Sequence, residues 1–198
     1  MITPTDRDEY RSLINDRRTQ LKTELLAIFP SPSEFVWEIG SGHGHFLTEF
    51  ATHHPLQTFL GIDIIADRVA RATRKRDRAQ LKNLHFLHTE ARLFLEALPE
   101  HATISSVLIL FPDPWPKKRH NKHRILQSEF LTLLRPHVRS DAPLFFRTDH
   151  QPYFEHARAT LADHPLWKLA DDPWPFEHET VFQHRADSYH SLSARPRP

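Results

Sequence analysis

The sequence predicts an α/β protein built on an open, mostly parallel β-sheet, with helices on both faces and an antiparallel C-terminal part. Short apolar stretches alternate with amphipathic ones along most of the chain, which is typical of a doubly wound sheet. Residues 104–111 form a continuous apolar run rich in β-formers, as expected of a parallel strand buried on both faces. A cluster of glycines directly follows the first short apolar stretch.

The N-terminal part is expected to be one helix, residues 1–30, because apolar residues recur near helical spacing until Pro30 and Pro32. Residues 34–165 contain the alternating apolar and amphipathic stretches. Strands are predicted over 35–39, 58–63, 84–88, 104–111 and 144–149, and helices over 43–54, 66–82, 91–98, 122–134 and 153–161. Residues 166–198 alternate weakly and are expected to add antiparallel strands. All three parts are expected to form a single domain over residues 1–198.

The composition restricts the class of protein. The chain has 198 residues, 39% of them hydrophobic, and no cysteine, so disulfides, thiolate metal sites and a cysteine nucleophile are excluded and no metal is expected. No apolar run approaches the ~18 residues that a membrane helix needs, and the first residues do not form a secretory signal. We therefore expect a cytoplasmic protein, a monomer or homodimer, with no membrane partner.

The glycine cluster predicts a ligand site. Gly40, Gly42 and Gly44 follow the first strand, where glycines permit a tight turn and close approach of a ligand. A dinucleotide site would have G-x-G-x-x-G, but His45 stands at the third glycine, and Glu38 would repel a pyrophosphate. Negative charge suits the ammonium and sulfonium of S-adenosylmethionine. The alternative is an ordinary glycine turn.

Acidic residues follow the next two strands. Asp63 ends the second strand, where this kind of sheet places the acid that binds ribose hydroxyls. Glu90 follows the third strand, where it could hold the adenine. Alternatively, Glu90 only stabilises the dipole of the helix that it precedes.

The stretch after the fourth strand is the most informative. Pro112 and Pro114 bracket Asp113 and fix its backbone, and Trp115 follows. The net charge is only +1, but cations crowd the next residues: Lys117, Lys118, Arg119, Lys122 and Arg124. A rigid carboxylate, a stacking surface and phosphate-binding charge together suit a base in RNA, with Arg119, Lys122 and Arg124 as RNA contacts. A solvated loop would explain the charges, but not the prolines and the tryptophan.

The sequence resembles the bacterial tRNA (guanine-N7-)-methyltransferase family over roughly residues 34–185. The resemblance rests on Glu38–Gly44, Asp63, Pro112–Trp115 with the cationic run, and Thr148–Asp149. It implies a Rossmann-like class I methyltransferase fold, S-adenosylmethionine as cofactor, tRNA as partner, and methylation of the guanine at variable-loop position 46.

The resemblance also implies residue roles. Glu38, Asp63, Glu90 and Asp113 would line the cofactor site, with Thr89 as an alternative to Glu90. The substrate contacts would be Lys117, Asp149, and Thr180 with Gln183, which replaces the glutamate of the family's Thr-x-x-Glu element. Because the methylated base gains positive charge, Asp113 is the predicted catalytic carboxylate and Asp149 the second choice.

Two other functions remain open. The first is an RNA-binding module on a degenerate methyltransferase fold, which would not bind S-adenosylmethionine. The second is a small-molecule methyltransferase, which would show no salt-dependent affinity for tRNA.

Overall fold

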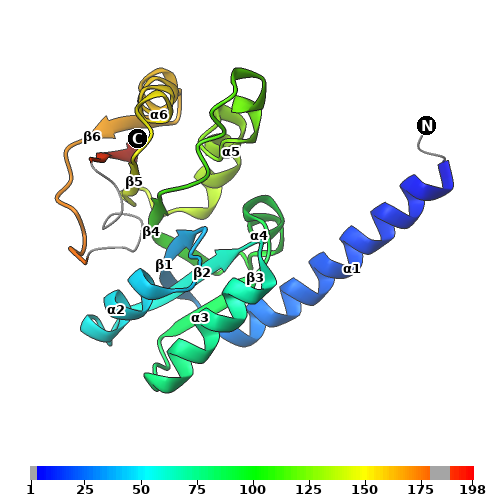
Figure 1. Ribbon diagram of the computed structural model, residues 1–198. Helices are drawn as coiled ribbons and strands as arrows, with labels where there is room; N and C mark the ends of the chain where they lie inside the picture. Colours follow the sequence, from blue (N-terminus) through cyan, green and yellow to red (C-terminus); the bar gives the residue numbers. More distant parts are fainter. Residues whose placement is uncertain (1–3, 179–187) are drawn as a thin grey trace.

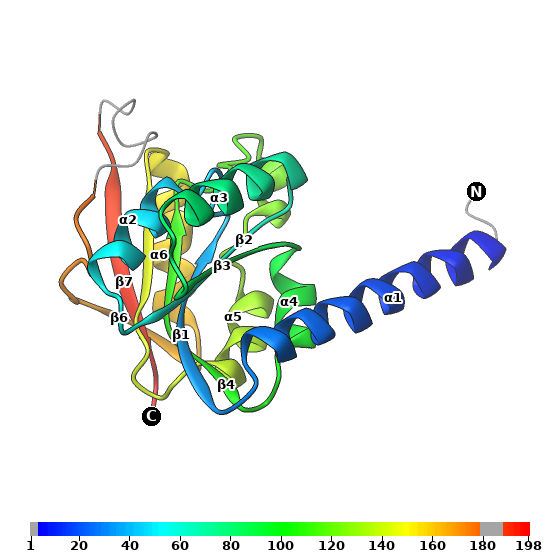
Figure 2. The same cartoon turned by 90° about the horizontal axis from the view of Figure 1, so that it is seen from below.

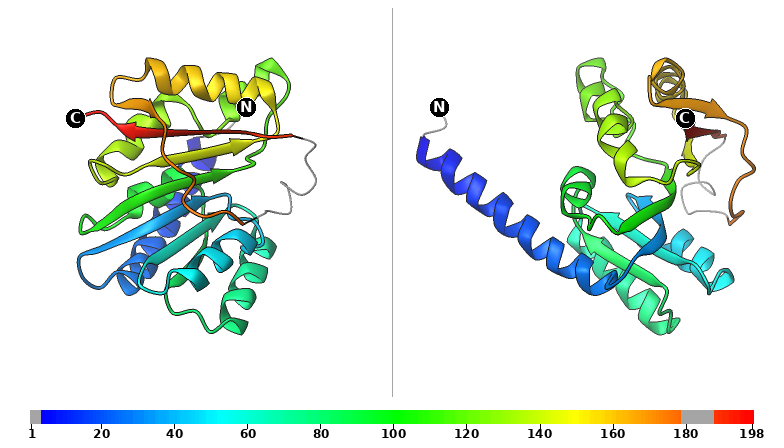
Figure 3. Two further views of the ribbon diagram at one scale, coloured as in Figure 1. Left: turned by 90° about the vertical axis from the view of Figure 1, so that its left-hand side faces the viewer. Right: turned by 180° about the vertical axis from the view of Figure 1, so that it is seen from behind.

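A mixed β-sheet forms the centre of the computed structural model, which describes residues 4–178 and 188–198 (Figure 1). Within this part the sheet has seven strands in the order β3-β2-β1-β4-β5-β7-β6. Their bounds are β1 Ser33–Ile39, β2 Thr58–Asp63, β3 Leu84–His88, β4 Ala102–Leu110, β5 Leu144–Thr148, β6 Trp167–Ala170 and β7 His190–Pro196. Strands β1 to β5 run parallel, and β7 is antiparallel to β5 and β6, which it separates (Figure 3). The predicted sheet is confirmed.

Helices cover both faces of the sheet. Their bounds are α1 Pro4–Ile28, α2 His45–His53, α3 Ala66–Arg78, α4 Ala91–Ala97, α5 Ser128–Leu134 and α6 Gln151–Asp163, with two short 3₁₀ helices, η1 Lys118–His123 and η2 Arg135–His137. Helices α2 and α3 pack on one face, and the end of α1 with α4, α5 and α6 packs on the other (Figure 2).

Side chains of each strand alternate between two hydrophobic cores. In β1, Phe35 and Trp37 join the core under α1 and α4, whereas Val36 joins the core under α2 and α3. In β5, Phe146 belongs to the first core and Phe145 to the second. This period of two is what a strand covered on both faces requires, and it explains why these strands are apolar throughout.

The longest helix packs only at its C-terminal end. Leu21 and Leu25 of α1 are buried, whereas Leu13 is 61% exposed. The N-terminal half of α1 therefore extends away from the sheet (Figure 1). No helix among the described residues combines the length and the apolar character needed to cross a lipid bilayer.

The predicted helix over 122–134 is wrong in its first half. Residues 118–123 form η1, Arg124 is extended, and α5 begins only at Ser128. The hydroxyl of Tyr153 accepts the backbone N–H groups of Ile125 and Leu126, at 3.1 and 3.5 Å, which a helix would have used internally. A tertiary contact thus replaces the local pattern at this point.

Candidate active site

The predicted acidic residues lie along one edge of the sheet. Glu38 is the second-last residue of β1 and pairs in register with Gly61 of β2. Asp63 is the last residue of β2. Asp113 follows the end of β4, and Asp149 directly follows β5, whose Arg147 pairs with Leu110 of β4. Because these strands are parallel and adjacent, their carboxyl ends form a common rim, which is where ligands bind in open α/β sheets.

The glycine loop is shaped for a close ligand. Gly40 and Gly42 have φ of 76° and 56°, and a Cβ added at either position would meet no atom within 4 Å. At Gly44, by contrast, a Cβ would come within 2.6 Å of the Phe86 ring. Gly44 is therefore required for packing, whereas Gly40 and Gly42 leave free space at the rim.

Asp63 holds this loop against β2. Its Oδ2 accepts the N–H of Gly42 at 3.0 Å, and its Oδ1 accepts the N–H of Ile65 at 2.8 Å. Arg68 Nη1 lies 3.8 Å from Oδ2. The carboxylate has further lone pairs for a ligand hydroxyl, so Asp63 orders the loop and keeps acceptor capacity at the rim.

Glu38 is the most unusual group at the rim. The residue is 4% exposed, and its Oε2 has no hydrogen-bond partner within the described part of the chain. Burial, reinforced by the charge of Asp63, raises the pKa of Glu38 to about 8. A buried carboxylate without a partner is unfavourable, so this group would be stabilised by a cationic ligand in the loop.

The loop after β4 presents Asp113 to solvent. Asp113 is exposed, and Trp115 is 37% exposed. Two residues of the loop have positive φ without being glycine, Phe111 at 48° and Trp115 at 45°. The N–H of Phe111 donates to the Arg147 carbonyl at 2.7 Å, which ties the loop to β5. Such backbone conformations persist only where surrounding structure enforces them, and they occur often at functional sites.

The cationic run divides into two environments. Lys117, Arg119 and Lys122 are exposed on and beside η1. Arg124 is 4% exposed, and its guanidinium donates to the Pro114 and Pro152 carbonyls at 2.9 and 3.3 Å. The structure therefore separates Arg124 from the exposed cluster in which the sequence placed it.

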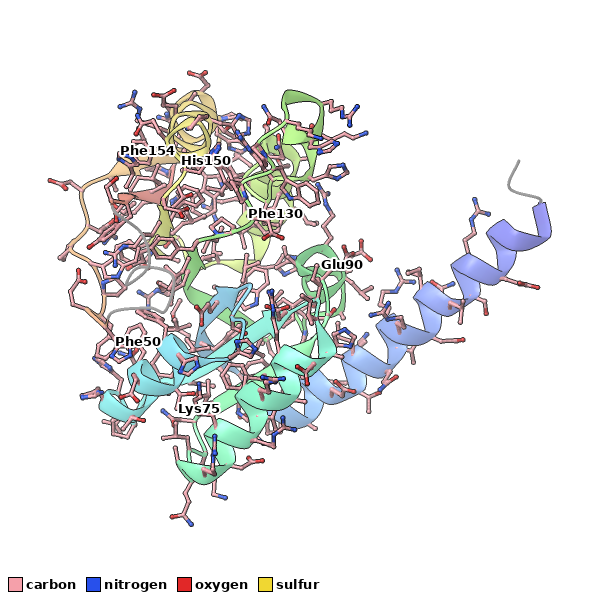
Figure 4. All side chains as sticks on the ribbon, in the orientation of Figure 1. Phe50, Lys75, Glu90, Phe130, His150 and Phe154 are labelled. Atoms are coloured by element: carbon pink, nitrogen blue, oxygen red, sulfur yellow. The ribbon has the colours of Figure 1, made fainter. Side chains whose placement is uncertain are left out.

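Of the two candidates after β3, Thr89 is buried and Glu90 is exposed at the start of α4 (Figure 4). The N–H of Thr89 donates to the Asp63 carbonyl at 3.2 Å. Thr89 and its neighbour Glu90 therefore lie beside Asp63. Both remain candidates. Thr180 and Gln183 lie outside the described residues.

Sequence reasoning missed Arg147. It is buried in β5, its Nε donates to Ser191 Oγ at 2.9 Å, and its guanidinium lies 3.7 Å from the ring centre of Trp174. A hollow of about 340 Å³ beside it is lined by Trp174, Ser191 and residues of β6 and β7, not by Glu38, Asp63 or Asp113. A cation within an otherwise apolar strand was the signal that could have revealed Arg147.

Solved structures with the same architecture include methyltransferases. An antibiotic-related methyltransferase superposes with a TM-score of 0.58 at 18% identity, over 88% of this chain and 92% of that one. TrmN from Thermus thermophilus gives a TM-score of 0.59 at 15% identity, over 88% of this chain and 48% of that one. The described fold is thus the Rossmann-like fold of methyltransferases. A family model described as "putative methyltransferase" matches residues 32–189, and the chain belongs to that family, which implies a methyl donor.

Relatives named tRNA (guanine-N(7)-)-methyltransferase share much of the sequence. The protein of Magnetococcus marinus is 38% identical over 142 residues, covering 71% of this chain and 56% of the relative. That of a Synechococcus species is 40% identical over 140 residues, covering 70% and 59%. That of Thermus thermophilus is 34% identical over 155 residues, covering 78% and 50%. The matched part of the chain thus spans between half and three-fifths of the length of these relatives.

Among the described residues, no group of three or more His, Asp and Glu side chains is arranged to hold a metal ion.

Proposed function

We propose that the protein methylates N7 of a guanine in tRNA, at variable-loop position 46, with S-adenosylmethionine as the methyl donor. One observation carries the proposal: Asp113, flanked by two prolines, is exposed after β4, the strand that pairs with the strand of Glu38, and shortly before an exposed cationic turn. Cofactor, base and RNA backbone would then meet at one edge of the sheet. The names of the relatives support the same substrate.

The residues at the glycine loop fit S-adenosylmethionine. Glu38 offers a buried oxygen without a partner for the ammonium, and Gly40 and Gly42 leave space for the backbone to approach the ligand. Asp63, which has acceptor capacity left beside the Gly42 N–H, would bind the ribose hydroxyls, and Thr89 or Glu90 would contact the adenine. When bound, the cofactor supplies a methyl group already activated by the sulfonium.

Asp113 would act on the base. Guanine N7 has a free lone pair at neutral pH, so the protein needs no strong general base and acts mainly by positioning. The carboxylate of Asp113 would stabilise the positive charge that develops on the base, with Asp149 on the neighbouring strand end contacting the substrate. Trp115 offers a surface for stacking, and Lys117 contacts the nucleotide.

The exposed cations would bind the tRNA backbone. The slope of log K against log salt is negative, with close to one unit for each phosphate contact. Replacing Lys117, Arg119 and Lys122 with glutamine should therefore make this slope shallower by about 2–3 units. Filter binding across a salt series measures this slope. A matched control replaces Arg17, Lys22 and Lys168, which are exposed elsewhere, and should change the slope by less than about one. Equal slopes in the two triple variants would show that the cationic turn is only a solvated loop.

Methyl transfer to tRNA that lacks N7-methylguanosine tests the function as a whole. We expect nucleoside analysis of the product to show one N7-methylguanosine per tRNA, which is lost when the variable-loop guanine is replaced. A protein that binds tRNA but takes up no S-adenosylmethionine would instead be the binding module. One that binds the cofactor without salt-dependent tRNA affinity would be a small-molecule methyltransferase.

A further inference from the structure

Arg124 is a buried cation that the proposed reaction does not use. It follows η1 in an extended conformation and turns its side chain inward, so that only 4% of the residue is exposed. Burying a guanidinium costs free energy unless it is fully paired. Its contacts among the described residues therefore indicate what it holds in place.

The guanidinium joins the two segments that carry or follow the candidate carboxylates. Its Nε donates to the carbonyl of Pro114, the residue after Asp113, at 2.9 Å. Its Nη1 donates to the carbonyl of Pro152 at 3.3 Å, three residues after Asp149. One side chain thus bridges the segment after β4 and the start of α6.

Tyr153 fixes Arg124 itself. The guanidinium carbon lies 4.7 Å from the centre of the Tyr153 ring, and the Tyr153 hydroxyl accepts the N–H groups of the two residues after Arg124. Burial raises the pKa of Tyr153 to about 12, and the charge of Asp113 adds to this shift. The charge of Asp113 therefore acts on Tyr153, on whose ring Arg124 packs.

This arrangement needs the chemistry of arginine. The planar guanidinium donates in two diverging directions while its face packs on an aromatic ring, whereas an ammonium is a point charge on a flexible stem. A phosphate could reach the group only if the side chain left its buried position, because only 4% of the residue is exposed. The same side chain is unsuited to be one of the surface phosphate contacts.

We propose that Arg124 is a positioning residue that fixes the loops of Asp113 and Asp149 relative to each other, and that it is not an RNA contact. The reaction that it would serve rests on the proposed function. Displacing a reacting group by about 1 Å can cost up to 10²-fold in rate, so loss of the bridge should affect chemistry more than binding.

The experiment compares Arg124→Gln with Arg124→Lys. At saturating tRNA and S-adenosylmethionine, Arg124→Gln should lower the single-turnover rate roughly 10–100-fold. The salt slope of its tRNA binding should stay within about 0.3 of the wild-type slope, whereas Arg119→Gln should make the slope shallower by about one unit. Arg124→Lys keeps the charge and one donor, so it should recover part of the rate with the slope unchanged. Arg17→Gln, on the exposed part of α1, serves as the neutral control for the rate.

Hydrogen exchange gives a readout independent of activity. In Arg124→Gln, amides in residues 111–117 and 149–156 should exchange faster, while those of β1 and β2 keep their protection. If Arg124→Gln does not fold, the saturated rate, the salt slope and hydrogen exchange of Arg124→Lys test the proposal instead. A shallower salt slope with an unchanged saturated rate would overturn the proposal in favour of an RNA contact, and unchanged exchange in both loops would overturn the bridge. A wild-type protein that methylates no tRNA would instead refute the proposed function, and hydrogen exchange would still decide whether Arg124 holds the loops.

Discussion

Replacing Asp113 with asparagine is expected to lower the single-turnover rate of tRNA methylation about 10²–10³-fold, the usual loss for one well-aimed electrostatic group. Asparagine keeps the shape of the side chain between the two prolines and removes its charge. The positive charge developing on guanine then loses its counter-charge, while the exposed cations that bind the RNA backbone are unchanged. The affinity for tRNA should therefore stay within about threefold, because the phosphate contacts supply most of it.

The rate must be measured with both tRNA and S-adenosylmethionine saturating, because Asp113 is also a predicted cofactor contact. Asp16→Asn, an exposed carboxylate on α1, is the matched control and should react at the wild-type rate. If Asp113→Asn also keeps the wild-type rate, Asp113 is structural, and Asp149→Asn becomes the variant to test. A fall in tRNA affinity without a fall in rate would make Asp113 a recognition group and not a catalytic one.

The order of the elements was predictable because local pattern and tertiary burial agree. Residues 58–63 and 84–88 form strands with the predicted bounds, since both are short apolar runs that lie inside a parallel sheet. The segment from Arg124 to Gln127 was not predictable in this way. The N–H groups of Ile125 and Leu126 bond to the hydroxyl of Tyr153, which is remote in sequence, and no periodicity within the segment encodes that contact.

The location of the candidate site followed from topology, but its internal contacts did not. Acidic residues after successive parallel strands must share one rim, so Glu38, Asp63 and Asp113 could be grouped from the sequence alone. Whether a cation near them points outward or inward depends on partners from other elements. Arg124 looked like its exposed neighbours in the sequence, and its contacts with the Pro114 and Pro152 carbonyls and with the Tyr153 ring distinguish it.

The replacement of Glu38 with glutamine should have opposite effects on binding and on stability. Losing a charged partner for the ammonium should weaken S-adenosylmethionine binding about 10–100-fold, the equivalent of roughly 1.5–3 kcal/mol. The ligand-free protein should nevertheless gain stability at alkaline pH. Burial raises the pKa of Glu38 from 4.5 to about 8, so the wild-type protein loses stability as pH rises through this window, on the order of a few kcal/mol in total. Glutamine cannot ionise and avoids this loss.

The raised pKa of Glu38 predicts that the protein releases a proton when the cofactor binds. At pH 7 the free wild-type protein holds Glu38 mostly protonated, and pairing with an ammonium would release close to one proton. Affinity should rise with pH up to about 8 and then fall, because the α-ammonium of the ligand itself titrates at roughly 7.7–8.0. Calorimetry in buffers of different ionisation enthalpy counts the protons, and Glu38→Gln should release none at this site. A wild-type protein that binds S-adenosylmethionine at pH 7 without proton release, and no more tightly than Glu38→Gln does, would show that Glu38 does not meet the ammonium.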